Sequence, residues 1–167
     1  ITFPEMCKVF GIPELRQKAH FCAVSSTSGT ATEVTAFSVI TDYEKGIKYP
    51  LADFQITPDV AIVDPELAET MPKKLVAHTG MDALTHAVEA YIGRSNVKST
   101  AAYAEKATKM IFDNLETAYA DGKNIEAREA MLKGSYYAGM AFTRAYVGYV
   151  HAIAHNLGGH YGIPHGL

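Results

Sequence analysis

Residues 80–91 have the sequence Gly-Met-Asp-Ala-Leu-Thr-His-Ala-Val-Glu-Ala-Tyr. Apolar side chains recur here at helical spacing, which predicts a helix over residues 82–92. Asp82 and His86 stand four residues apart. Four helical residues rotate by roughly 400°, so both side chains emerge on one face of that helix. A carboxylate beside an imidazole offers two ligands to a divalent metal ion, although a hydrogen bond within one helix explains the pair equally well.

A second pair of side chains has the same spacing. His151 and His155 lie in an apolar stretch, and neighbours such as Val150 and Ile153 predict a largely buried helix, in which histidines need partners. His165 follows on a separate element, between a proline and a glycine. One aspartate with three or four histidines makes a complete metal shell of the kind that suits Fe²⁺ or Zn²⁺. A zinc peptidase is disfavoured, because no glutamate follows the first histidine.

The prolines divide the chain into two parts. None falls between Pro72 and Pro164, so residues 73–167 are predicted to be all-helical. We expect a helix break at Gly80, a join between two helices near Gly139, and a helix end at the paired glycines after residue 157. Besides residues 82–92, the predicted helices cover residues 99–119, 125–141 and 142–157.

The part before Pro72 has the pattern of short strands and turns. Apolar or extended stretches occur at residues 21–24, 37–40, 48–51 and 60–63. The last of these is a β-branched run bounded by proline and aspartate, which is typical of a buried strand. A hydroxyl-rich run follows the first, at residues 25–35, and could offer donors to a phosphate or an amide, although such runs are most often ordinary loops. Lys48 lies just downstream, where a solvated lysine is the simpler interpretation.

Composition narrows the class of protein. The chain has 167 residues, is 48% hydrophobic and carries a formal net charge of −3. The apolar content excludes disorder as the dominant state, and the charge balance argues against a nucleic-acid partner. Two cysteines argue against a disulfide scaffold and favour a reduced, cytoplasmic setting. No run predicts a membrane span or a secretory signal. Because the chain begins with Ile1 and ends just after His165, we expect it to be part of a longer protein.

Three segments together resemble the signatures of the iron-dependent (group III) alcohol dehydrogenases. They are residues 27–35, 80–91 and 151–166. The resemblance implies the two-domain architecture of the dehydroquinate synthase-like and iron alcohol dehydrogenase enzymes, truncated at both ends. Residues 1–72 would be the C-terminal part of an α/β nucleotide-binding domain. Residues 73–167 would be the N-terminal part of an all-α metal-binding domain.

The resemblance also assigns roles to individual residues. His155 would lie beside substrate and nicotinamide as the catalytic proton relay. The metal ligands would be Asp82, His86, His151 and His165. The cofactor site would include Thr27, Gly29, Thr30, Thr35 and Lys48.

The implied activity is reversible hydride transfer between a primary alcohol or aldehyde and NAD or NADP, with Fe(II), or Zn(II) in its place, as Lewis acid. The partner would be a small-molecule substrate, with no nucleic acid and no membrane, and the full-length protein would be a homo-oligomer. The family's Gly-Gly-Gly-Ser phosphate-binding turn is absent from this chain. Its absence keeps open the alternative of a non-catalytic metal-binding helical fragment. A polyol dehydrogenase of the same superfamily is a further alternative.

Overall fold

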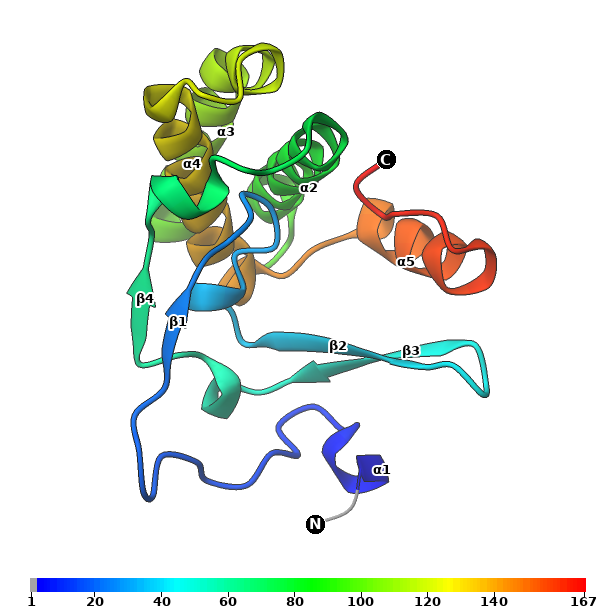
Figure 1. Ribbon diagram of the computed structural model, residues 1–167. Coiled ribbons are helices and arrows are strands. Elements are labelled where there is room, and N and C mark those ends of the chain that lie inside the picture. The colour runs from blue at the N-terminus through cyan, green and yellow to red at the C-terminus, as the bar shows by residue number, and fades with distance from the viewer. Residues whose placement is uncertain (1–2) are drawn as a thin grey trace.

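The structure is a computed structural model and describes residues 3–167. Figure 1 shows the long helices packed together, the last helix set apart from them, and the strands below. The helices are α1 (Phe3–Met6), α2 (Lys73–Ile92), α3 (Lys98–Ala120), α4 (Ile125–Ala145) and α5 (Tyr149–Tyr161). The strands are β1 (Cys22–Val24), β2 (Phe37–Asp42), β3 (Ile47–Ala52) and β4 (Val60–Ile62). Short 3-10 helices are η1 (Thr32–Val34), η2 (Phe54–Ile56) and η3 (Pro65–Ala68).

Helices α2, α3 and α4 pack against one another around an apolar core. Ile111, Met131 and Leu132 are its largest fully buried side chains from α3 and α4. Small residues let the helices approach closely: a Cβ on Gly134 would lie 2.8 Å from Cγ1 of Ile111. The side chain of Asn124 accepts a hydrogen bond from the Ala127 N–H and so caps the start of α4. The predicted all-helical character of residues 73–167 is confirmed, and this packing stabilises α2, α3 and α4.

Three of the predicted helix boundaries are wrong. Gly80 does not break α2, because a glycine there is a packing residue: a Cβ would lie 2.4 Å from Cδ1 of Leu115. Gly139 is not a join, since α4 runs through it to Ala145 and the chain turns at Tyr146, whose φ is +65°. The paired glycines 158–159 lie inside α5, which ends at Gly162 with a left-handed φ of +67°.

The strands form two separate pairs. β1 and β4 are parallel, with Ala23 opposite Ala61, while β2 and β3 form an antiparallel hairpin. All four fall where the sequence predicts extended stretches. The buried-strand prediction is wrong for β4, because Val60 and Ile62 are about half exposed. Their β-branched side chains have no covering layer among residues 3–167.

The hydroxyl-rich segment before β2 lies against the helices and joins the two parts of the chain. Gly29 packs on Thr79 of α2. Ala31 and Val34 pack on Gly139 of α4, where a Cβ would lie 2.4 Å from Cβ of Ala31. The segment is therefore a packed connection between the two parts and differs from an ordinary exposed loop.

Helix α5 stands apart from the bundle, as Figure 1 shows, and lies over the β2–β3 hairpin. The prediction that it is largely buried is wrong: Val150 and Ile153 are 56% and 61% exposed. His151, on its other face, is buried. No helix within residues 3–167 has both the length and the apolar character required to cross a membrane.

Candidate metal and cofactor site

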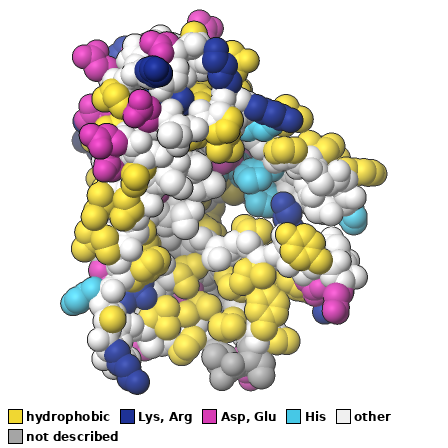
Figure 2. All heavy atoms as spheres, viewed as in Figure 1, with side chains coloured by type: hydrophobic (Ala, Val, Ile, Leu, Met, Phe, Trp, Pro, Cys, Tyr) yellow, Lys and Arg dark blue, Asp and Glu magenta, His cyan; other side chains and the backbone are white. Residues whose placement is uncertain are grey.

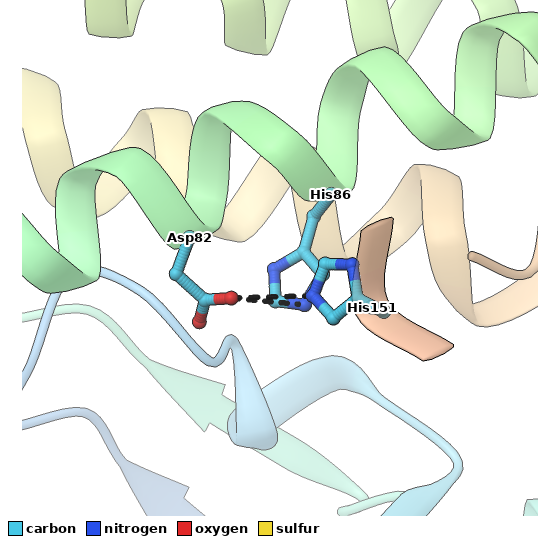
Figure 3. Close-up of side chains that lie close together, drawn as sticks. All are labelled: Asp82, His86 and His151. Carbon is cyan, nitrogen blue, oxygen red and sulfur yellow. Dashed lines mark hydrogen bonds and ion pairs between the residues drawn. The ribbon is translucent and has the colours of Figure 1, made fainter. Parts of the chain in front are cut away.

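One carboxylate and two imidazoles converge between α2 and α5 (Figure 3). Asp82 and His86 project from the same face of α2, as their spacing predicts, and His151 comes from the first turn of α5. Oδ1 of Asp82 lies 3.2 Å from Nε2 of His151 and 3.6 Å from Nε2 of His86. Each of the three residues offers one ligand atom, and these atoms lie within 4.8 Å of one another. All three side chains are buried.

His165 approaches the same oxygen from the segment after α5. Its Nε2 lies 3.5 Å from Oδ1 of Asp82. The ring of His155 stacks on that of His165, with 4.9 Å between centroids, and lies 5.9 Å from the ring of His151. The structure thus brings the four predicted ligands together and sets His155 beside them.

Burial and hydrogen bonds shift the pKa values of these groups in different directions. Burial lowers the pKa of His86 to about 4, so its ring is neutral at physiological pH. Burial would raise the pKa of Asp82, but hydrogen bonds with His151 and His165 hold it well below its usual value. Burial, followed by the neighbouring His165 and His151, lowers the pKa of His155. Burial would lower the pKa of His151, but hydrogen bonds with Asp82 and Glu89 raise it, so a metal ion would have to displace a proton from this ring. The ionised Asp82 and the neutral His86 already have the forms that ligate metals.

Aromatic stacking fixes the His86 ring. Its centroid lies 4.1 Å from that of Phe142 on one side and 4.4 Å from that of His151 on the other. Phe37 from β2 stacks in turn on Phe142, at 5.9 Å. Sequence reasoning did not find Phe142, because an apolar residue on a helix usually belongs to the core and nothing local sets this one apart.

Sequence reasoning also gave no role to Glu89, which stands behind His151. Its Oε2 lies 2.6 Å from Nδ1 of that histidine. A signal existed, because Asp82, His86 and Glu89 occupy positions i, i+4 and i+7 of one helix face. The burial of His151 raises the need for partners, and both of its ring nitrogens have one.

A cleft of about 930 Å³ contains the cluster. It lies between the β2–β3 hairpin, η1 and α5, and Figure 2 shows histidine side chains gathered at a hollow in this surface. Of the five predicted cofactor residues, Thr30, Thr35 and Lys48 line it. Thr27 and Gly29 do not: Gly29 is buried against α2 instead.

Lys48 is more than a solvated side chain. It is half-buried on β3, and its Nζ lies 3.3 Å from the point where a Cβ on Gly158 would be. The ammonium group therefore reaches across the cleft to α5. A positive charge and threonine hydroxyls in one cleft suit a polar, anionic ligand.

The donor set fits a divalent ion. Nε2 atoms of three histidines face one oxygen of a buried aspartate, and imidazole with a single carboxylate suits Fe²⁺ and Zn²⁺. The parts of the chain that supply these groups are far apart in the sequence, and no helix-internal hydrogen bond explains their convergence.

Two family models match the chain. The C-terminal model of the Fe-containing alcohol dehydrogenase family matches residues 76–167, and the model of iron-containing alcohol dehydrogenase matches residues 5–65. The chain belongs to the iron-containing alcohol dehydrogenase family. The resemblance inferred from the sequence is confirmed.

Relatives and solved structures agree with this assignment. The chain is 58% identical to an NADPH-dependent butanol dehydrogenase of Clostridium saccharobutylicum over 99% of its own length and 42% of the relative's. It is 50% identical to a 1-propanol dehydrogenase of Salmonella typhimurium, covering 87% of this chain and 39% of that protein. The chain thus spans about two fifths of the length of these relatives.

The solved structures show the same fold. A 1,3-propanediol oxidoreductase superposes with a TM-score of 0.84 at 50% identity, over 87% of this chain and 38% of that one. A sulfoacetaldehyde reductase of Bifidobacterium kashiwanohense, solved with NAD⁺, superposes with a TM-score of 0.86 at 39% identity, over 92% of this chain and 41% of that one. The predicted fold class, an α/β part followed by an all-α part of the iron alcohol dehydrogenase architecture, is confirmed.

Proposed function

We propose that this chain carries the metal centre and part of the nicotinamide site of an alcohol dehydrogenase that interconverts a primary alcohol and an aldehyde. The observation that carries the proposal is the convergence of three imidazoles on one buried carboxylate inside a cleft that Thr30, Thr35 and Lys48 also line. The names of the relatives, which include dehydrogenases of butanol and 1-propanol, support this class of substrate.

The ligands we assign are Asp82, His86, His151 and His165. A divalent ion held by them would supply Lewis-acid polarisation of a substrate oxygen, and a nicotinamide would exchange the hydride. The protein's own contribution is placement. Phe142 and His151 hold His86 between their rings, so this ligand is positioned before any ion binds.

His155 is the proposed proton relay. Its ring is half-buried in the cleft and stacks on His165, so it lies next to the ligand cluster. Its lowered pKa keeps it neutral at physiological pH, which suits a group that accepts a proton from an alcohol.

Thr30, Thr35 and Lys48 are proposed to bind the cofactor. Lys48 offers the cleft a positive charge, which would attract an anionic group of NAD or NADP. Thr27 and Gly29 are proposed to act indirectly, by fixing the segment that presents Thr30. This division follows from the cleft lining, which includes Thr30 and excludes the other two.

We further propose that residues 1–72 and 73–167 belong to the cofactor-binding and metal-binding domains, as the separate family matches support. We propose Fe(II) as the ion, with Zn(II) as the substitute, a cytoplasmic location, and a homo-oligomeric full-length enzyme with a small-molecule substrate.

The test is metal-dependent alcohol oxidation. The full-length protein is purified without oxygen, loaded with Fe(II) or Zn(II), and assayed with 1-butanol or 1-propanol and NAD⁺ or NADP⁺. We expect turnover that a chelator removes, that added metal restores, and that Asp82→Ala lacks. Turnover that survives both chelation and Asp82→Ala would contradict the proposal. Metal binding with neither turnover nor cofactor binding would favour the non-catalytic alternative.

A further inference from the structure

We propose that Glu89 is a positioning residue, which holds the hydrogen on Nδ1 of His151 and fixes the orientation of the ring, so that Nε2 is the nitrogen presented to a metal ion. The inference rests on the proposed metal centre. Glu89 is none of the predicted ligands, and it lies on the far side of His151 from Asp82.

The first step is the hydrogen-bond partner of each ring nitrogen. Nδ1 of His151 lies 2.6 Å from Oε2 of Glu89, and Nε2 lies 3.2 Å from Oδ1 of Asp82. An ionised carboxylate only accepts hydrogen bonds, so Nδ1 must carry the hydrogen. Nε2 likewise donates to Asp82 in this structure. A metal ion in the ligand cluster would take the place of the hydrogen on Nε2, while Glu89 keeps the hydrogen on Nδ1.

The second step is that the same carboxylate also holds the backbone that carries the ring. Oε1 of Glu89 accepts a hydrogen bond from the N–H of Val150 at 2.8 Å, and Oε2 accepts one from the N–H of His151 at 3.4 Å. Gly148 permits this approach, since a Cβ there would lie 2.9 Å from Oε1. These contacts satisfy N–H groups at the start of α5, which have no partner within the helix.

The third step is the connection back to the other ligands. Asp82, His86 and Glu89 all belong to α2, while His151 belongs to α5. Two carboxylates of one helix therefore hold the two nitrogens of one imidazole from another. Glu89 is 5% exposed, and among residues 3–167 no lysine or arginine forms an ion pair with it. Its charge is directed at His151 and the first turn of α5.

The competing explanation is that Glu89 only caps the start of α5. The Glu89→Gln variant distinguishes this explanation from the proposed positioning role. A glutamine has one acceptor oxygen and one amide that only donates. If its oxygen faces the backbone N–H groups, its amide faces Nδ1, which must then give up its hydrogen and leave it on Nε2. If its oxygen faces Nδ1, the amide opposes the N–H of Val150. The variant keeps the volume and loses one of the two functions.

The experiment is titration of the metal-depleted protein with Co²⁺, followed by visible absorption, in the parent protein and in Glu89→Gln. Partners of this kind typically change metal affinity by roughly 10–100-fold, so we expect Co²⁺ binding weaker by that factor and an altered ligand-field spectrum. Glu129→Gln is the matched control, because that glutamate forms an exposed pair with Lys133 on α4 and lies outside the site. Far-UV circular dichroism checks that each variant is folded.

A second measurement needs no variant. In the Zn²⁺-loaded parent protein with ¹⁵N-labelled histidine, we expect the His151 signals of a ring protonated on Nδ1 and metal-bound through Nε2. Metal bound through Nδ1 would overturn the proposal, as would a Glu89→Gln protein with the parent's affinity and spectrum. Failure of the parent protein to bind Co²⁺ or Zn²⁺ at all would instead overturn the metal centre itself, and this inference with it.

Discussion

Gly29 approaches α2 so closely that a Cβ on it would lie 2.6 Å from Cβ of Thr79 and 2.9 Å from the Thr79 carbonyl oxygen. This contact joins the hydroxyl-rich segment to the helix that carries Asp82 and His86. Three residues after Thr79, α2 presents its carboxylate to the site. The glycine thus links the proposed cofactor segment with the proposed metal ligands, although its own backbone does not line the cleft.

Gly29→Ala should force the segment away from α2. Overpacking of this kind typically costs about 1–3 kcal/mol, because the obstructing atoms include helix backbone that cannot rotate aside. We expect the free energy of unfolding in urea to fall by that amount, with weaker NAD(P)⁺ binding. Ser26→Ala is the control, since Ser26 is an exposed neighbour in the same segment. Equal stability of the two variants would show that the segment can move at little cost.

The variants His86→Ala and His155→Ala should distinguish the role of a metal ligand from that of a proton relay. His86 faces Asp82 and is held between two rings, so its loss removes one ligand and opens a cavity beside the others. We expect His86→Ala to lose its metal during purification, as measured by plasma mass spectrometry. His155→Ala should keep about one ion per chain and turn over more slowly in the full-length enzyme. Equal metal loss in the two variants would refute the division of roles.

The sequence predicts the ligand cluster better than the helices that carry it. Asp82 and His86 share a face because of a four-residue spacing, which is a local property of any helix. Helix boundaries depend instead on distant partners. From the sequence alone, Gly80 is predicted to break a helix, but the structure shows Leu115 of α3 packed over it. Gly139 is predicted to join two helices, but the structure shows Ala31 packed against it.

Burial was the least predictable property. The apolar residues of α5 predict a covered helix, yet Ile153 is exposed while His151 is buried. A burial pattern is a property of what packs against a helix, and only the His151 face of α5 meets α2 within residues 3–167. The same reason applies to β4. Its β-branched residues predict a buried strand, but Val60 and Ile62 are about half exposed.

Phe142→Ala should loosen the ligand ring that it supports. Phe142 is 6% exposed and stacks on both His86 and Phe37. Truncation of a buried phenylalanine typically costs about 3–5 kcal/mol, and here it also frees one side of the imidazole. We expect a lower unfolding midpoint and faster loss of metal to a chelator. Phe112→Ala on the exposed face of α3 is the control and should change neither. A destabilised protein with unchanged metal release would assign Phe142 to the core alone.

Thr143→Val should weaken the connection between α4 and the strands. The hydroxyl oxygen Oγ1 of Thr143 accepts a buried hydrogen bond from the N–H of Ala36 at 2.9 Å, across 107 residues of sequence. Valine has nearly the same shape but no acceptor, so the Ala36 N–H would stay buried without a partner at a cost of about 1–3 kcal/mol. We expect a lower free energy of unfolding and faster hydrogen exchange at the Ala36 amide.

Thr143→Ser supplies the matched control, because it keeps the hydroxyl and removes only a methyl group. If the hydrogen bond is what matters, serine should retain slow exchange at the Ala36 amide while valine loses it. If packing matters more, the serine variant should be the less stable of the two, and the Ala36 amide should exchange at the same rate in both variants. The amide of Ala36 reports the bond directly, because it lies immediately before β2, at the point where the chain passes from the segment held by α4 into the hairpin beneath α5.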